Sequence, residues 1–388
     1  MFFLTILFII MAVINIKKIE LVVINSIYFF LYLIMPLYSV WDNRIIFNAL
    51  VSVIIVNVIN VFKLKQVQKE TIKGYLPAAS ILASVFFMVI FLSSTGGVFN
   101  SLQNQKFVFF EARQGLGLVH LAYTSFWMYS SSWLLIHKPK TVWTYIYFVL
   151  GYFTGAKRLW LTPLVIVFFY VIKMKKNFKI LFLSSALLIS IPIVFTISFY
   201  ARLVGEERQE LFKYLPRYFD TYVRAYEFYL SPISQLTFYY PLEKLLSELG
   251  LMVNYYASSS LYFTSVYYPL IFNLTGAGYH FPIEVEFISN FGKYGYVLSG
   301  VVLGFITLFY RFVSSQIRDK YLFSIFMGIT TIQYYWIIRG GLFNWVLILE
   351  VLTLINILLL MRFEFKVING IKRKYARFVS KVAKNERI

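Results

Sequence analysis

One polar stretch of the sequence has the residue types of a site that activates a hydroxyl group. Between Gly276 and Gly295 the chain holds a histidine and two carboxylates, His280, Glu284 and Glu286, among glycines and aromatic residues. Imidazole and carboxylate groups act as general bases. These three residues are therefore the candidate catalytic residues. The alternatives are a hydrogen-bonded structural histidine and carboxylates that lie on a solvated face or pair with arginine.

A set of arginines forms the second group of candidates. The planar guanidinium donates bidentate hydrogen bonds to phosphate oxygens, which suits arginine to an anion site at the level of the lipid headgroups. The candidate anion-binding residues are Arg158, Arg339, Arg202, Arg208, Arg217 and Arg224. The alternative for each is an ion pair with a nearby carboxylate or a nonspecific contact with lipid headgroups.

The composition determines the setting in which these residues act. Of the 388 residues, 60% are hydrophobic and 14% are charged, against about 45–50% and about 25% in ordinary globular domains. Such a chain has too little polar surface for a water-soluble body, which excludes a soluble enzyme and a disordered protein. The absence of cysteine excludes disulfides and thiolate chemistry. With three histidines in all, no multi-histidine metal site is expected.

The distribution of apolar residues predicts an all-α polytopic integral membrane protein. A membrane span needs roughly 17–25 mainly apolar residues, and the whole chain, 1–388, reads as one integral membrane domain with about 11 transmembrane helices. The predicted spans are 1–16, 19–40, 45–62, 75–95, 115–136, 141–156, 158–172, 178–200, 290–311, 320–338 and 341–361.

The charges orient these spans. One set of alternate connections, together with a basic tail at 362–388, holds 24 of the 37 basic residues and 5 of the 17 acidic residues. Cytoplasmic loops carry the excess of lysine and arginine, so the N-terminus is expected outside and the C-terminus, with its basic cytoplasmic tail, inside. This asymmetry accounts for the net charge of +20 without nucleic acid as a partner. Contact with anionic membrane lipids is expected instead.

The outer side carries one long connection, 201–289. Loops beyond about 12–15 residues are usually functional, and this one is rich in Tyr, Phe and Leu. Charged residues recur every three or four positions after Pro216, which predicts an amphipathic helix on the membrane surface. In this topology Arg158 and Arg339 lie at the outer mouths of spans, next to the loop.

The layout and two motifs resemble a known family. A Gly-Ala-Lys-Arg turn lies within Thr154–Leu159, and an Asn-Phe-Gly-x-x-Gly stretch runs from Asn290 to Gly295. With about eleven spans and one large outer loop, they resemble the Wzy polymerases of O-antigen and capsular polysaccharide. The resemblance implies a GT-C-like membrane glycosyltransferase in the bacterial inner (plasma) membrane. Its substrates would be undecaprenyl-pyrophosphate-linked oligosaccharides, polymerised at the outer face.

The resemblance also implies roles for the candidate residues. The arginines would stabilise the charge that develops on the departing pyrophosphate, and His280, Glu284 or Glu286 would accept a proton from the attacking hydroxyl. No metal or nucleotide cofactor is required, because the donor is already activated. A chain-length regulator protein is an expected partner.

Three other functions stay open at this point. The O-antigen ligase has the same layout and substrate carrier. A flippase that transports the same lipid-linked units is favoured by Glu350, the one carboxylate placed inside a span. A membrane acyltransferase would need an inner histidine motif, and His137 is the only histidine placed inside. Gly300 and Gly304, a small-xxx-small pair, predict close helix packing rather than chemistry.

Overall fold

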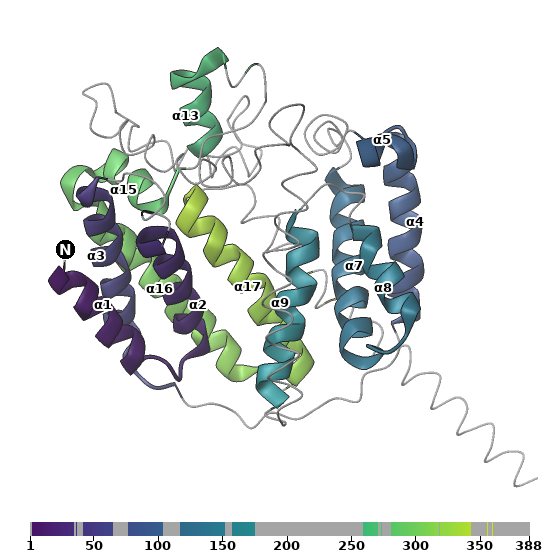
Figure 1. Ribbon diagram of the computed structural model, residues 1–388, viewed down its shortest axis with the longest axis horizontal. Coiled ribbons are helices and arrows are strands. Elements are labelled where there is room, and N and C mark those ends of the chain that lie inside the picture. The colour runs from purple at the N-terminus through teal and green to yellow at the C-terminus, as the bar shows by residue number, and fades with distance from the viewer. Residues whose placement is uncertain are drawn as a thin grey trace, which may run out of the picture. The chain divides into compact units, whose positions relative to one another are not determined.

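A computed structural model describes much of the chain (Figure 1). The described residues are 2–34, 36, 42–64, 77–103, 117–151, 157–174, 259–270, 273, 281–317, 319–342, 355 and 359. All regular secondary structure in these ranges is helical, which agrees with the predicted all-α class. The chain divides into two compact units, unit 1 (Met1–Ile72 and Phe168–Glu350) and unit 2 (Lys73–Val167 and Val351–Ile388).

The helices follow the apolar segments of the sequence. Unit 1 contains α1 (Phe2–Ile14), α2 (Ile19–Phe29) with a π-helical extension η1 (Phe30–Ile34), α3 (Asn43–Ile59), α13 (Ser259–Tyr267), α15 (Ile283–Phe291), the 3₁₀ turn η5 (Gly292–Tyr294), α16 (Gly295–Gln316) and α17 (Lys320–Gly340). Unit 2 contains α4 (Ala78–Ser94), α5 (Gly97–Gln103), α7 (Gly117–His137) and α8 (Val142–Val149). The division between the units falls within α9 (Lys157–Met174).

In the part of the chain that the structure describes, two helical stretches have the length and composition to cross a membrane. They are residues 283–316, in which α15, η5 and α16 follow one another, and α17 with 21 residues. Five shorter apolar helices of 10–17 residues occupy further predicted spans. The predicted spans 178–200 and 341–361 lie outside the described residues, except for Gly341, Leu342, Ile355 and Leu359. The predicted surface helix after Pro216 and the intramembrane Glu350 also lie outside them.

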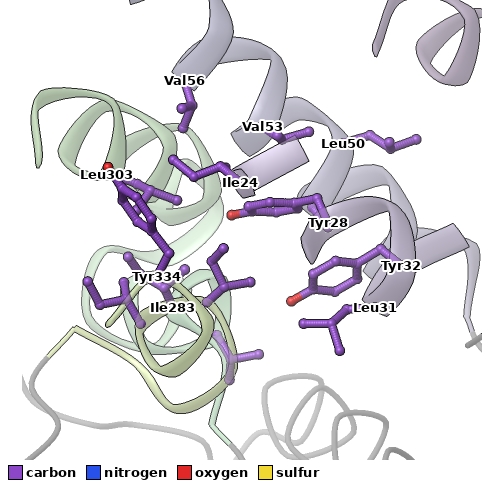
Figure 2. Packing of buried hydrophobic residues seen from close by; sticks show 14 of the residues in the cluster. Ile24, Tyr28, Leu31, Tyr32, Leu50, Val53, Val56, Ile283, Leu303 and Tyr334 are labelled. Atoms are coloured by element: carbon purple, nitrogen blue, oxygen red, sulfur yellow. The ribbon is translucent and has the colours of Figure 1, made fainter. Parts of the chain in front are cut away.

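In unit 1, α3 packs against α1, α2 and α16 (Figure 1). The apolar core is formed by residues of these helices together with residues of η1, α13, α15 and α17, some of which are labelled in Figure 2. α16 crosses α3 at two glycines. A Cβ atom on Gly300 would lie 2.7 Å from the backbone oxygen of Ser52, and one on Gly304 would lie 2.6 Å from the Ile59 side chain. Small residues let helix backbones approach closely. The close packing predicted for this glycine pair is therefore confirmed.

One end of unit 1 is held by a partly buried polar cluster that we call the Lys18 end. The Lys18 ammonium donates to the carbonyl oxygens of Asn60 (2.7 Å) and Val61 (2.5 Å), just past the end of α3. Arg311 of α16 donates to the same Asn60 carbonyl at 2.8 Å and to that of Phe62 at 2.8 Å. The last carbonyls of a helix carry partial negative charge, so two cations there stabilise the end of α3.

Unit 2 is organised around α7, which packs against α4 and α8. The Tyr147 hydroxyl of α8 is hydrogen-bonded to the Ser130 hydroxyl of α7 at 2.5 Å and also to Ser84 of α4. The Trp127 indole donates to the Tyr147 carbonyl at 3.1 Å. A Cβ atom on Gly151 would lie 2.5 Å from the Trp127 ring, so glycine is required where the chain leaves α8.

Several helices expose large apolar side chains on the face opposite their packing contacts. Phe305, Phe309 and Phe312 of α16 are each more than half exposed, as are Leu82 and Phe86 of α4. On α16 these residues recur at intervals of three and four, which places them on one face of the helix. Extended apolar surface of this kind marks contact with a membrane or another protein.

Candidate functional site

The structure describes some of the predicted site residues and not others. Glu284 and Glu286 lie in the first turn of α15, and Arg339 lies in the last turn of α17. Arg158 lies in the first turn of α9, and its side chain is not among those described. The remaining candidates lie outside the described residues: His280, Arg202, Arg208, Arg217 and Arg224. We call Glu284, Glu286 and Arg339, with the groups that hold them, the acid–arginine site.

α15 positions the two carboxylates on opposite sides of one short helix. It begins after Pro282, whose φ of −55° and ψ of 153° place it just outside the helix. Acidic residues in a first turn are stabilised by the positive end of the helix dipole. Residues two apart on an α-helix point in nearly opposite directions, so Glu284 and Glu286 face different neighbours. Both side chains are buried, with 0% and 1% exposure, so neither lies on a solvated face.

Glu284 is held by two tyrosines from α2 and its π-helical extension. The Tyr28 hydroxyl donates to Oε1 at 2.6 Å and the Tyr32 hydroxyl donates to Oε2 at 3.1 Å. Figure 2 shows both hydroxyl oxygens directed toward the side on which Ile283, the neighbour of Glu284, lies. The two rings are stacked with centroids 5.4 Å apart. Each carboxylate oxygen therefore has a neutral donor from the same helical segment.

Glu286 faces the turn that follows α17. Its Oε2 accepts a hydrogen bond of 2.6 Å from the backbone N–H of Leu342. A Cβ atom on Gly341 would lie 2.9 Å from both carboxylate oxygens, and Gly341 has a φ of +85°. Glycine is required here both by the backbone conformation and by the close approach of the carboxylate.

Arg339 lies two residues before this turn, with 1% exposure. Its Nη1 donates to the Tyr335 hydroxyl at 2.7 Å. The guanidinium lies over the rings of Tyr335 and Trp336, 5.4 and 5.7 Å from their centroids. A cation in the last turn of a helix is favoured by the helix dipole, and stacking on aromatic rings stabilises it further. α15 and α17 contact each other, so the acids and the arginine belong to one region of unit 1.

The Asn-Phe-Gly-x-x-Gly stretch forms the corner between α15 and α16. Gly292 adopts a φ of +60°, and a Cβ atom on Gly295 would lie 2.3 Å from the backbone of Phe287 and Ile288. The Asn290 amide donates to the Glu286 carbonyl at 2.8 Å. These residues therefore set the angle between α15 and α16. Because Glu284 and Glu286 lie on α15, this angle also determines the position of the two carboxylates.

The tyrosine partners of Glu284 were not predicted from the sequence. The only signal is the i, i+4 spacing of Tyr28 and Tyr32 in an apolar segment, which places them on one side of a helix. Tyrosine in such a segment is equally typical of a membrane interface. Nothing in the pattern identifies a partner more than 250 positions further along the chain.

The charged groups outside the predicted spans have physical surroundings that shift their ionisation. Burial lowers the pKa of Lys18 below its ordinary value, and the nearby positive charges of Arg311 and Lys63 lower it further. The hydrogen bonds that Asp42 accepts from the Arg44 side chain and backbone lower the pKa of Asp42. In the described part of the chain, no three His, Asp or Glu side chains gather as a metal site would need.

Comparison with known proteins gives no relative to set beside this geometry. No protein-family model, no curated protein and no solved structure matches the chain. Arguments about function therefore depend on the residues and contacts described above.

Proposed function

We propose that the protein is a multi-pass inner-membrane glycosyltransferase that polymerises undecaprenyl-pyrophosphate-linked oligosaccharide units into O-antigen or capsular polysaccharide. The observation that carries this proposal is the acid–arginine site. Two buried carboxylates and one buried arginine, all selected from the sequence for this chemistry, belong to one region of unit 1. The reaction needs these two kinds of group, a proton acceptor and a fixed positive charge.

The chemistry assigns a role to each group. The acceptor hydroxyl of a new lipid-linked unit attacks the anomeric carbon of the growing chain. A carbon–oxygen bond forms there while the bond from that carbon to the pyrophosphate breaks, and the lipid pyrophosphate leaves with the bonding electrons. Glu284 or Glu286, with His280 as the third candidate, accepts the hydroxyl proton. Arg339 stabilises the negative charge on the leaving group, and Arg158 and the arginines of the long loop are the other candidates for this role.

The burial of the carboxylates supports transfer to a sugar rather than to water. With 0% and 1% exposure, Glu284 and Glu286 are kept away from bulk solvent. A site that excludes water protects an activated donor from hydrolysis. This is the property that a polymerase needs in order to conserve its lipid-linked substrate.

Two further observations support a membrane setting with alternating helix directions. The exposed apolar faces of α4 and α16 offer surface to lipid. Lys18, Lys63 and Arg311, all predicted to be cytoplasmic, gather at the Lys18 end of unit 1. We propose that this end is cytoplasmic and that the acid–arginine site is at the outer face, with an N-out, C-in topology of about 11 spans.

The test is a gel of surface polysaccharide from a strain that lacks the gene, beside the complemented strain. We expect the ladder of chain lengths to collapse to a single repeat unit. Loss of all repeat units with accumulation of lipid-linked polymer would indicate the ligase, and accumulation of single units on the inner face would indicate the flippase. An unchanged ladder would exclude a role in polysaccharide assembly.

Complementation with variants of Arg339 tests the site itself. Arg339→Ala should leave the collapsed pattern, because the charge at the leaving group is lost. Arg339→Lys keeps a charge but not the planar fork, so it separates a need for charge from a need for bidentate hydrogen bonds. Each variant requires proof by immunoblot that the protein is present in the membrane fraction at the level of the parent.

A further inference from the structure

We propose that Tyr28 and Tyr32 are positioning residues of the acid–arginine site, which hold the Glu284 carboxylate in one orientation and stabilise its charged form against the effect of burial. This inference rests on the proposed function, because it deepens the role assigned there to Glu284. It adds two residues of α2 and its extension, a segment in which the sequence predicted no site residue.

The first support is the geometry of the hydrogen bonds. Each tyrosine donates to a different oxygen of Glu284, at 2.6 and 3.1 Å. Two donors on two oxygens fix both the position and the rotation of a carboxylate, whereas one donor leaves it free to turn. Tyr28 and Glu284 are themselves almost fully buried, with 1% and 0% exposure, so water does not compete for these bonds.

The second support is an irregularity in the helix that carries the tyrosines. α2 is α-helical to Phe29, and residues 30–34 continue as a π-helix. Tyr28 lies in the α-helical part and Tyr32 in the π-helical part. π-helical turns are rare and occur frequently at functional sites. The wider turn changes the direction of Tyr32 relative to Tyr28, and both hydroxyls reach the same carboxylate.

The consequence for the chemistry follows from the identity of the donors. Hydrogen bonds to the charged form of a carboxylate favour that form, and only the charged form accepts a proton. A buried carboxylate without such donors would take up a proton and lose its function as a base. Burial raises the pKa of Glu284, and the hydrogen bonds from the Tyr28 and Tyr32 hydroxyls act in the opposite direction. The tyrosine hydroxyls thus oppose the protonation of Glu284 inside a region from which water is excluded.

The experiment uses the full chain in membranes, with Tyr28→Phe, Tyr32→Phe and the double variant. Each change removes one oxygen and keeps the ring, so the stacking of the two rings is retained. The matched control is Tyr147→Phe in unit 2, which removes a buried hydroxyl that is hydrogen-bonded to Ser130 and lies in no proposed site. Glu284→Gln, which lacks the carboxyl group, is the negative control for labelling at position 284.

The first readout does not depend on catalysis. Dicyclohexylcarbodiimide reacts with protonated carboxyl groups in apolar surroundings, and mass spectrometry identifies the modified residue. We expect labelling of Glu284 to increase severalfold in the single variants and further in the double variant, with no change in Tyr147→Phe. Unchanged labelling in the double variant would overturn the inference.

The second readout is chain extension of lipid-linked units. We expect each single variant to lower kcat by about tenfold, the value of one hydrogen bond to a charged acceptor, with KM little changed. Increased labelling with normal kcat would also overturn the inference, because the tyrosines would then hold a carboxylate that has no part in the reaction. If the parent protein extends no chains, the proposed function fails, and the labelling alone decides whether the tyrosines control Glu284.

Discussion

Gly341 is the position at which the architecture of the acid–arginine site can be tested most sharply. Alanine there adds a Cβ atom 2.9 Å from both oxygens of Glu286, at a φ of +85°. The atoms in the way are the far end of a flexible side chain, so the carboxylate is expected to move rather than the backbone. Its hydrogen bond from the Leu342 N–H, 2.6 Å long, would then be lost.

The magnitude has two parts that a control separates. The positive φ costs alanine about 1–3 kcal/mol at either glycine compared. Displacement of the carboxylate costs a further about 1.5–3 kcal/mol, the value of a hydrogen bond to a charged group. Gly97→Ala is the matched control, because Gly97 has a φ of +86° and nothing within 4 Å of its added Cβ. It should show the first cost without the second.

The assay is the free energy of unfolding, measured by titration with SDS in mixed micelles, for Gly341→Ala, Gly97→Ala, Glu286→Ala and the double variant Gly341→Ala/Glu286→Ala. In the Glu286→Ala background the added methyl meets no carboxylate, so the coupling energy should equal the second cost. A coupling energy near zero would refute the contact between Glu286 and the turn after α17.

Three further predictions concern packing, pH and topology. Gly300→Ala should destabilise the protein by about 1–3 kcal/mol in the same SDS assay. The effect should be larger than that of Gly304→Ala, because the added Cβ meets backbone at position 300 and a flexible side chain at position 304. A larger effect of Gly304→Ala would contradict the packing of α16 on α3. The folded state lowers the pKa of Asp42 through its bonds from the neighbouring arginine. The contribution of Asp42 to the stability of the fold is therefore complete above the pKa of the unfolded state, about 3.9. This contribution is lost as the pH falls through the lower pKa of the folded state. In Asp42→Asn the melting temperature should no longer fall in this acid range, while the amide still caps α3. A melting temperature that depends on acid pH as it does in the parent protein would contradict this prediction. Because the chain has no cysteine, single substitutions report topology directly. An impermeant maleimide should label Lys293→Cys in intact spheroplasts and Lys63→Cys only after permeabilisation, whereas the opposite result would reverse the proposed orientation.

The sequence predicted several helices, missed others and gave no sign of their corners. The predicted long connection 201–289 contains α13 and most of α15, neither of which was predicted as a helix. The apolar segments 19–40 and 320–338 correspond to α2 with its π-helical extension and to α17, because an apolar run of this length is longer than a typical strand and favours a helix. The predicted span 290–311 begins five residues before α16, which starts at Gly295. Apolar composition continues through the corner at Gly292, where the positive φ ends α15. A hydropathy pattern records composition and carries no information on such a change of direction.

The site was predicted in its residue types and not in its contacts. Glu284, Glu286 and Arg339 were selected because carboxylates and arginines on the outer side of a membrane protein need a reason. Their partners come from distant segments, Tyr28 and Tyr32 for Glu284 and the Leu342 N–H for Glu286. Only the packing of α15 against its neighbours brings these groups together. The roles of His280, Arg158 and the loop arginines stay predictions.

The measurement that tests the central claim most directly is chain extension by the purified protein in liposomes. The substrate is the lipid-linked repeat unit extracted from the strain that lacks the gene, and the products are separated by length. We expect lipid-linked products of two and more repeat units with the parent protein and their loss with Arg339→Ala. Persistence of the single unit alone, with a parent protein that is folded and correctly inserted, would contradict the claim that this chain is a polymerase.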